Sequence, residues 1–210
     1  MKQKMFLILS IQNDGEKAVV QMNNKFYDLL ESNPVIAAIK DDEGLDLCCR
    51  YNEIKVVFIL YGDICSLKHI VDKLHKAGKI AIVHIDLITG LSGKEIAVQF
   101  LKENTDVDGI ISTKPSLIKK ANSLSLYTIL RVFVLDSMAF KNIDNLIRTG
   151  NPDVLEILPG VMPKIIKKVC KMLPIPIIAG GLISEREDVL EALDAGAISV
   201  SSTNPDVWLM

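Results

Sequence analysis

The sequence predicts a compact (β/α)8 barrel of the TIM type, with short loops and an abbreviated last helix. Eight short apolar runs rich in β-branched residues alternate with segments of helical periodicity, which indicates a parallel sheet covered by helices. The runs are apolar on both faces, as buried parallel strands are. An open flavodoxin-like sheet needs only about five strands and ranks second. The eight runs begin near Val35, Val56, Ile80, Asp108, Tyr127, Asp153, Pro176 and Ile198.

Most intervals between these runs contain a recognisable helix. The clearest covers residues 66–77, where the apolar side chains fall on one stripe and Gly78 ends the helix. Another begins at Ser184, which together with Glu187 resembles a capping box. We expect the last helix to be reduced to Pro205–Trp208.

The chain has 210 residues, of which 49% are hydrophobic and 24% are charged. This composition is typical of one globular domain with a well-buried core. Residues 1–22 fit no repeat, so we divide the chain into an N-terminal extension, 1–22, and a barrel domain, 23–210. The extension is expected either to cover the bottom of the barrel or to be poorly ordered, and Met22 is a possible alternative start.

The composition also predicts a cytoplasmic protein without a membrane anchor. The formal net charge of −2 creates no global field that would attract nucleic acid or an anionic membrane. The apolar run at residues 6–9 is too short for a signal peptide, and no stretch approaches the ~20 apolar residues of a membrane span. Four cysteines without metal-binding spacing indicate packing in a reduced compartment: Cys48, Cys49, Cys65 and Cys170.

The strongest indication of a binding site follows the last two runs. Gly180 and Gly181 end the seventh run just before a helix, and Ser202 and Thr203 end the eighth. Glycines let the backbone approach an anion, and free N–H groups at a helix start favour one. In TIM barrels the loops after strands 7 and 8 form the usual phosphate site. We therefore predict that these four residues bind the phosphate of a small ligand.

Further polar side chains occur where the other predicted strands end, which is where this fold places its sites. Burying a charge between strand and helix is costly, so we expect these side chains to face the barrel mouth. Arg131 and Glu156 lie in mid-strand and predict a mutual ion pair that is also open to ligand contact. The candidates for binding the non-phosphate part of the ligand are Lys40, Asp86, Lys114, Arg131 and Glu156.

Three positions at the mouth keep a second interpretation. Lys40 precedes acidic residues and fits a solvated loop equally well. Asp86 also fits a cap for the helix opened by Ser92 or Gly93, or a partner for His84, whose face it shares along an alternating strand. His84 fits either a ligand contact or a hydrogen-bonded core histidine. A P-loop, a dinucleotide fingerprint, a nucleophile elbow and a metal-ligand cluster are all absent from the sequence, so we assign no catalytic residue, metal or cofactor.

Several stretches go beyond a generic barrel, at residues 83–90, 108–114, 134–137, 156–160 with 163–164, and 179–183. In this order they resemble the glycerol-3-phosphate-responsive antiterminator family, also called the glycerol uptake operon antiterminator regulatory proteins. The resemblance covers residues 34–208. It implies a regulator and not an enzyme: a protein that senses glycerol 3-phosphate and acts on the leader mRNA of glycerol-utilisation genes, so that transcription passes a terminator.

The RNA partner is less visible in the sequence than the ligand. Lys164, Lys167 and Lys168 are the RNA-binding candidates. They cluster with Lys171, and a second lysine group lies at 114, 119 and 120. These lysines fit a local basic patch or merely solvated helix faces, and few aromatic residues are available for stacking on unpaired bases.

The principal alternative is a TIM-barrel phosphosugar lyase or isomerase. In that enzyme Lys114 or Lys40 would act as the electrophile and Glu156 or Asp86 as the base. A third interpretation is a barrel that binds a phosphorylated metabolite and signals to another protein. Fold alone does not separate these functions, and the sequence leaves homo-oligomerisation open.

Overall fold

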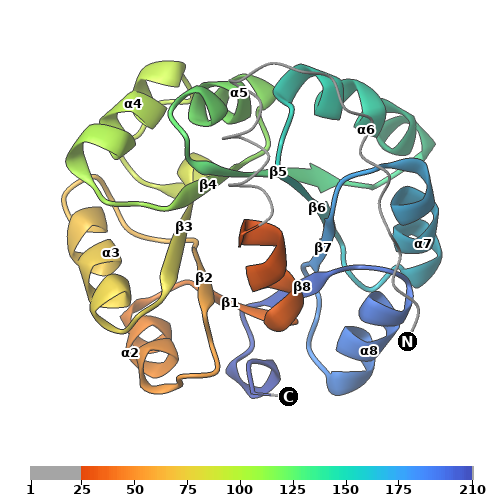
Figure 1. Cartoon of the computed structure of the whole chain (residues 1–210), viewed down its shortest axis with the longest axis horizontal. Helices are drawn as coiled ribbons and strands as arrows, with labels where there is room; N and C mark the ends of the chain where they lie inside the picture. Colours follow the sequence, from red (N-terminus) through yellow and green to blue (C-terminus); the bar gives the residue numbers. More distant parts are fainter. Residues whose placement is uncertain (1–24, 210) are drawn as a thin grey trace.

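The structure is a computed structural model that describes residues 25–209. Eight parallel strands form a closed barrel in the order β1 to β8, and the helices surround it (Figure 1). The predicted extension at 1–22 lies outside the described residues. The strands are β1 Val35–Ile39, β2 Val56–Ile59, β3 Ile80–His84, β4 Gly109–Ser112, β5 Tyr127–Phe133, β6 Val154–Leu158, β7 Ile177–Gly180 and β8 Ser199–Ser202. The helices are α2 Asp42–Arg50, α3 Leu67–Lys76, α4 Glu95–Asn104, α5 Pro115–Ser123, α6 Ser137–Gly150, α7 Pro163–Met172 and α8 Arg186–Asp194, with 3-10 helices η1 Ile85–Leu87 and η2 Pro205–Val207.

The predicted fold class is confirmed, and every strand begins within one residue of its predicted start. The last helix is indeed reduced, to the 3-10 turn η2. None of the helices between residues 25 and 209 combines the length and apolar character that a membrane crossing requires.

One helix start differs from the prediction. Helix α8 is capped by Glu185 and not by Ser184. The Asp188 carboxylate, and not that of Glu187, reaches back to accept hydrogen bonds from the N–H groups of Ser184 (2.9 Å) and Glu185 (3.1 Å). The Ser184 hydroxyl also donates to Asp188, so it is unavailable as a cap and the helix begins one residue later.

Alternation along the strands divides the core into two layers. One set of apolar side chains faces the helices, and the other fills the barrel interior. The interior set includes Phe58, Ile82, Ile129, Val154 and Ile178, all of them buried. This parity decides which polar residues near the strand ends face inward.

A helical segment at residues 25–32 covers the N-terminal end of the barrel, where it appears in the centre of Figure 1. Phe26 and Leu30 are buried in the interior layer, and the Phe26 ring stacks on Tyr127 with centroids 4.3 Å apart. The Ser199 hydroxyl donates to the Leu30 carbonyl at 2.9 Å. The residues that cover the bottom therefore belong to the segment that we assigned to the barrel domain.

Removing the Phe26 side chain should destabilise the barrel strongly. Phe26→Ala should lower the free energy of unfolding by about 3–5 kcal/mol, because it leaves a cavity at the closed end of the interior. Asp28→Ala is the matched control, since Asp28 is exposed on the same segment. Urea unfolding of the two variants measures the difference. Equal, small losses would mean that the segment does not seal the interior.

Candidate functional site

A buried polar network lies inside the barrel near its C-terminal end. Arg131 Nε lies 2.6 Å from Glu156 Oε2, and the Ser201 hydroxyl donates to Glu156 Oε1 at 2.7 Å. Glu156 is completely buried, and Arg131 is 8% exposed. The predicted ion pair is thus confirmed. The two residues lie on neighbouring strands, β5 and β6, and the register of this pair places Arg131 directly beside Glu156.

Strand parity places this network in the interior and not under the helices. Each of four residues follows an interior apolar residue by two positions on the same strand. Residues two positions apart face the same side of a sheet, so these four also face the barrel interior. The pairs are Ile82 with His84, Ile129 with Arg131, Val154 with Glu156, and Ile178 with Gly180.

Gly180 makes room for the network. A Cβ atom at this position would lie 2.5 Å from Glu156 Oε1 and 2.6 Å from Ser201 Oγ. A side chain here would therefore break the contact between Ser201 and Glu156. This tight packing explains why position 180 is a glycine, which the sequence did not reveal. The predicted contact of Gly180 with a phosphate stays a prediction.

The other predicted phosphate residues lie on adjacent strands at the mouth. Gly181 has φ +73°, a conformation that favours glycine. The Ser202 hydroxyl is buried; it donates to the Ile183 carbonyl (2.7 Å) and accepts from Asn204 N–H (3.0 Å), while Thr203 is exposed. The fold brings β7 and β8 together, so the four residues share one side of the mouth.

Asp86 belongs to the opposite side of the mouth, near β3 and β4. Strand β3 ends at His84 and Asp86 lies in η1, so our expectation that strand alternation gives both one face is wrong. Asp86 Oδ2 accepts from Ser112 Oγ (2.9 Å), Thr113 N–H (2.9 Å) and Thr113 Oγ1 (3.3 Å). Burial opposes ionisation, but these hydrogen bonds outweigh it and lower the pKa of Asp86. Asp86 thus ties η1 to the β4–α5 loop and does not cap α4, whose N-cap is Lys94.

The two lysines predicted to contact ligand occupy different environments. Lys114 Nζ lies 3.3 Å from Asp86 Oδ1, and the Lys114 side chain is 48% exposed. A Cβ at Gly93 would clash with the Lys114 ammonium, so Lys114 packs directly against the β3–α4 loop. Lys40 directly follows β1 and is exposed. The desolvated pocket that activates a Schiff-base lysine surrounds neither of them.

His84 is buried in the same region and stays neutral at physiological pH. Burial, followed by repulsion from the Arg131 charge, lowers the pKa of His84 to about 4. A neutral imidazole carries one hydrogen-bond donor and one acceptor. We singled out His84 from the sequence without placing it among the ligand-binding residues.

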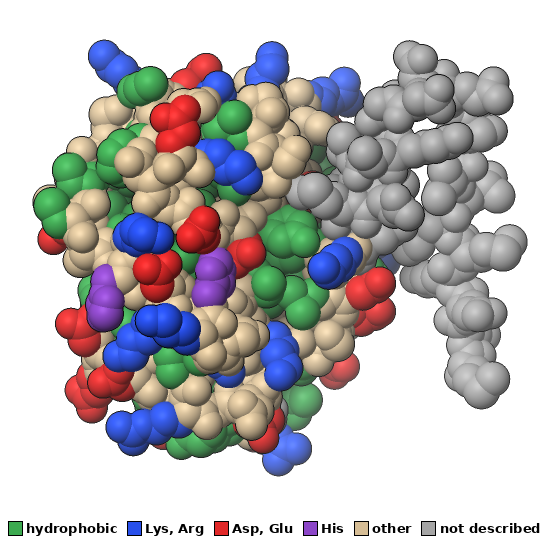
Figure 2. Space-filling view, turned by 60° about the vertical axis from the view of Figure 1, so that its left-hand side comes forward, with side chains coloured by type: hydrophobic (Ala, Val, Ile, Leu, Met, Phe, Trp, Pro, Cys, Tyr) green, Lys and Arg blue, Asp and Glu red, His purple; other side chains and the backbone are tan. Residues whose placement is uncertain are grey.

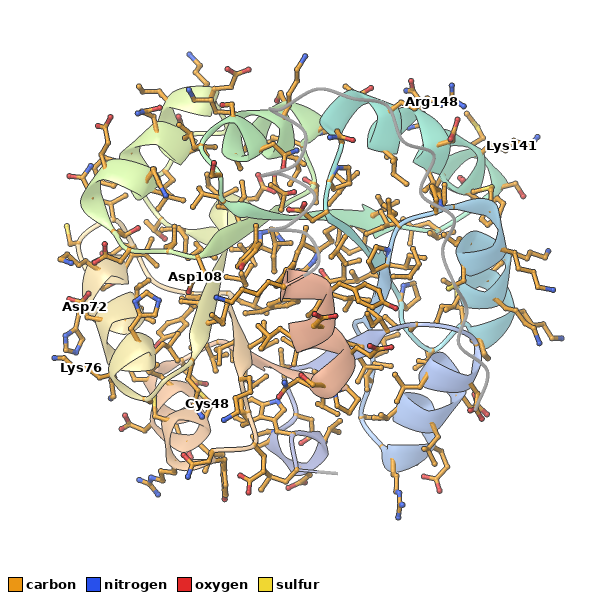
Figure 3. All side chains as sticks on the ribbon, viewed as in Figure 1. Cys48, Asp72, Lys76, Asp108, Lys141 and Arg148 are labelled. Carbon is orange, nitrogen blue, oxygen red and sulfur yellow. The ribbon has the colours of Figure 1, made fainter. Side chains whose placement is uncertain are left out.

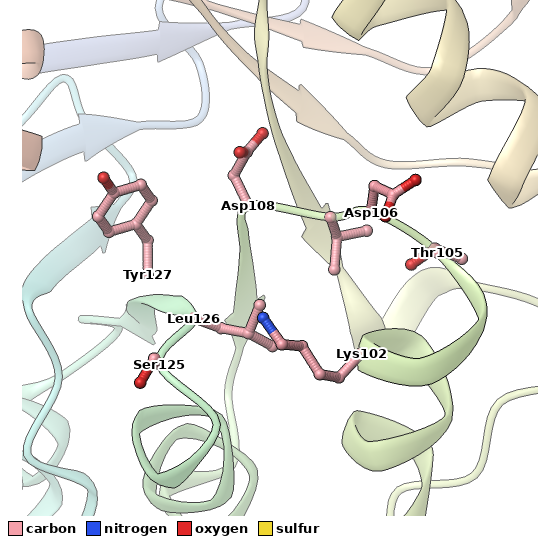
Figure 4. Close-up of a pocket in the computed structure, with 8 residues that line it drawn as sticks. Lys102, Thr105, Asp106, Asp108, Ser125, Leu126 and Tyr127 are labelled. Atoms are coloured by element: carbon pink, nitrogen blue, oxygen red, sulfur yellow. The ribbon is translucent and has the colours of Figure 1, made fainter.

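A surface pocket of about 410 Å³ lies at the other end of the barrel (Figure 4). It lies between the α4–β4 and α5–β5 connections, at the N-terminal ends of two strands, and Asp108 and Tyr127 line it. Asp108 is already engaged by His75 Nε2 (2.9 Å) and Ala81 N–H (2.7 Å). This pocket is therefore separate from the mouth.

Basic residues gather on the outer side of α7. Its buried residues are Ile166 and Val169, which leaves the lysines exposed. Within the described chain none of these lysines forms an ion pair with a carboxylate. On the neighbouring helix α6, Lys141 and Arg148 also point outward (Figure 3), and neither is among the RNA-binding residues predicted from the sequence. By contrast, acidic and basic side chains are interspersed on the face that Figure 2 shows. The exposed lysines of α7 are Lys164, Lys167, Lys168 and Lys171.

The fold defines a TIM-type barrel with a cluster of polar side chains at the C-terminal ends of its strands. The sequence model described as glycerol-3-phosphate responsive antiterminator matches residues 35–208. The chain therefore belongs to this family, as the sequence stretches indicated.

Three relatives illustrate the similarity. The Escherichia coli protein YgcP is 46% identical over 182 residues, which cover 87% of this chain and 95% of that protein. The glycerol uptake operon antiterminator regulatory protein of Listeria monocytogenes is 33% identical with a TM-score of 0.80, over 83% of this chain and 94% of its own. A glycerol uptake operon antiterminator-related protein of Thermotoga maritima is 32% identical with a TM-score of 0.75, over 85% and 99%.

Removing one member of the buried ion pair should be costly. Glu156→Gln leaves the Arg131 charge buried without a counter-ion, so the free energy of unfolding should fall by about 3–5 kcal/mol. Adding Arg131→Met should recover part of this loss, because the pair is coupled. Asp144→Asn is the control, since the exposed Arg148–Asp144 pair (2.8 Å) should contribute under about 1 kcal/mol. Urea unfolding measures the wild type, the three single variants Glu156→Gln, Arg131→Met and Asp144→Asn, and the double variant Glu156→Gln with Arg131→Met. Strictly additive losses in the double variant would argue against the coupling.

Proposed function

We propose that this protein is a glycerol-3-phosphate sensor that binds leader mRNA of glycerol-utilisation genes and lets transcription pass a terminator. Membership of the antiterminator family over residues 35–208 carries the proposal. We further propose that it works in the cytoplasm, as a regulator and not as an enzyme, and without a cofactor.

The arrangement of the mouth supports a small phosphorylated polyol as the ligand. The β7 and β8 side offers backbone at Gly181 and the exposed hydroxyl of Thr203, groups suited to a phosphate. The β3 and β4 side offers the Asp86 carboxylate, which accepts hydrogen bonds from hydroxyl groups. Lys114 on the β3 and β4 side and Arg131 on β5 add positive charge, although each already has a carboxylate partner.

The environment of the lysines supports a regulator over a lyase or isomerase. A Schiff-base mechanism needs a neutral, desolvated amine. Lys114 lies against a carboxylate and is half exposed, and Lys40 is exposed. Glu156, the proposed base of such an enzyme, is held by Arg131 and Ser201.

Ligand and RNA would be coupled by linkage. A ligand that favours one arrangement of the mouth loops also favours any RNA complex that uses this arrangement. The loop at residues 89–93 is a suitable moving part, because it is flanked by glycines and carries the Lys114 contact at Gly93.

Thermal unfolding tests the ligand. Glycerol 3-phosphate at a hundredfold excess over its Kd should stabilise the folded protein by about 2.7 kcal/mol. Glycerol and inorganic phosphate are the controls and should shift the midpoint much less. Gly181→Val should abolish the shift, whereas Gly78→Val, which has a similar φ of +71° in a turn away from the mouth, should keep it. A normal shift in Gly181→Val would place the phosphate elsewhere.

Charge reversal on α7 tests the RNA face. Lys167→Glu with Lys168→Glu should weaken binding of the leader RNA and flatten its salt dependence by roughly 0.7 per lost phosphate contact, and should leave the ligand-induced thermal shift intact. Lys55→Glu with Lys76→Glu changes the net charge equally at exposed positions away from α7 and should have little effect. Filter binding over a salt series gives both quantities. Equal losses in the two double variants would mean a different RNA face.

A further inference from the structure

Two buried side-chain atoms near the end of β3 have no hydrogen-bond partner in the described chain, and they are His84 Nδ1 and Asp86 Oδ1. Buried polar atoms are nearly always partnered, because leaving one without a partner costs about 1–3 kcal/mol. A core histidine placed only for structure would have its ring nitrogens satisfied. Both atoms lie at the same strand end, and the two residues are close enough for the Asp86 charge to act on the His84 ring. Two such atoms in one region point to a common binding partner.

The Asp86 carboxylate is oriented by the protein itself. Its Oδ2 atom receives three hydrogen bonds from Ser112 and Thr113, which fix the plane of the carboxylate and leave Oδ1 on the other side. Lys114 Nζ forms an ion pair with Oδ1 at 3.3 Å. Within the described residues no donor is aligned to make a hydrogen bond with this oxygen. Because an ionised carboxylate only accepts, and repels other anions, Oδ1 suits a hydroxyl donor and not a phosphate.

His84 complements this acceptor. It follows Ile82 by two positions, so it faces the barrel interior and not the helices. The charges that act on its ring are Arg131 from β5 and Asp86 from η1, and burial keeps the ring neutral. A neutral ring offers its Nδ1 as a partner to a hydroxyl group without adding a net charge.

We propose that His84 and Asp86 form a hydroxyl-binding subsite, which holds the polyol end of a phosphorylated polyol while its phosphate lies on the β7 and β8 side. This inference rests on the proposed function and adds the orientation of the ligand and a binding residue, His84. Lys114 covers the subsite from the mouth, and its half-exposed side chain moves aside when the hydroxyl reaches Oδ1.

Calorimetric titration with three phosphate esters tests the subsite in the full chain. Glycerol 3-phosphate carries two hydroxyl groups, 3-hydroxypropyl phosphate one and propyl phosphate none. Wild-type affinity should fall by about tenfold or more from the first ester to the last, because each hydroxyl lost leaves a buried polar atom unpaired. Equal affinity for all three esters would overturn the subsite.

Variants of His84 identify its role. His84→Leu should weaken glycerol 3-phosphate by about tenfold but propyl phosphate by less than about twofold, which removes the discrimination. His84→Asn places an amide near the position of Nδ1 and should retain most of the discrimination between the esters. His69→Leu, at an exposed position on α3, is the matched control and should behave as wild type. A urea midpoint for each variant verifies folding, and if His84→Leu does not fold, the asparagine variant and the wild-type ester series decide.

The outcomes separate the two proposals. If the wild type binds none of the esters, the proposed ligand and the subsite both fall. If it binds glycerol 3-phosphate but His84→Leu weakens all three esters equally, or none of them, the ligand stands and the subsite is wrong. Loss of discrimination in His84→Leu together with its retention in His84→Asn supports the subsite.

Discussion

The buried ion pair between Arg131 and Glu156 is the constraint on which the rest of the mouth depends. Neither charge is stable alone inside the barrel, so the pairing of β5 with β6 must hold them side by side. The second carboxylate oxygen of Glu156 also needs a hydrogen-bond donor, and the Ser201 hydroxyl on β8 provides it. Strand β7 lies between β6 and β8, and position 180 on it must be glycine because a Cβ atom there would clash with Glu156 and Ser201. One interaction therefore dictates residue choice on four consecutive strands and fixes the floor of the site.

Above this floor the mouth has two chemically different sides. The β7 and β8 side presents glycine backbone and hydroxyl groups, whereas the β3 and β4 side presents a carboxylate, a neutral imidazole and a lysine. Under the proposed function, a ligand that is anionic at one end and hydroxylated at the other is expected to bind with its phosphate on the β7 and β8 side. The division follows from the closed barrel, which sets strands three and four across the interior from strands seven and eight.

The barrel shares its architecture with many enzymes, so the distinction between sensing and catalysis depends on the state of its charged groups. Among the cations predicted to bind ligand, Arg131 and Lys114 each have a carboxylate partner, and the buried carboxylate Glu156 accepts from both Arg131 and Ser201. This network leaves no free base beside a desolvated amine among the residues considered for catalysis.

The sequence by itself determined the barrel, its strand positions and the family, because apolar runs of strand length at regular spacing allow few other folds. It also indicated the ion pair, since two opposite charges in mid-strand must find each other. Only the tertiary structure decided what depends on contacts between distant segments. The partners of Asp86 are about 26 residues away, the crowding at Gly180 comes from β6 and β8, and the unpartnered Nδ1 of His84 is visible only once every neighbour is in place. Local pattern fixes which way a strand faces, but hydrogen-bond partners are chosen by the closed barrel, whose geometry no single segment contains.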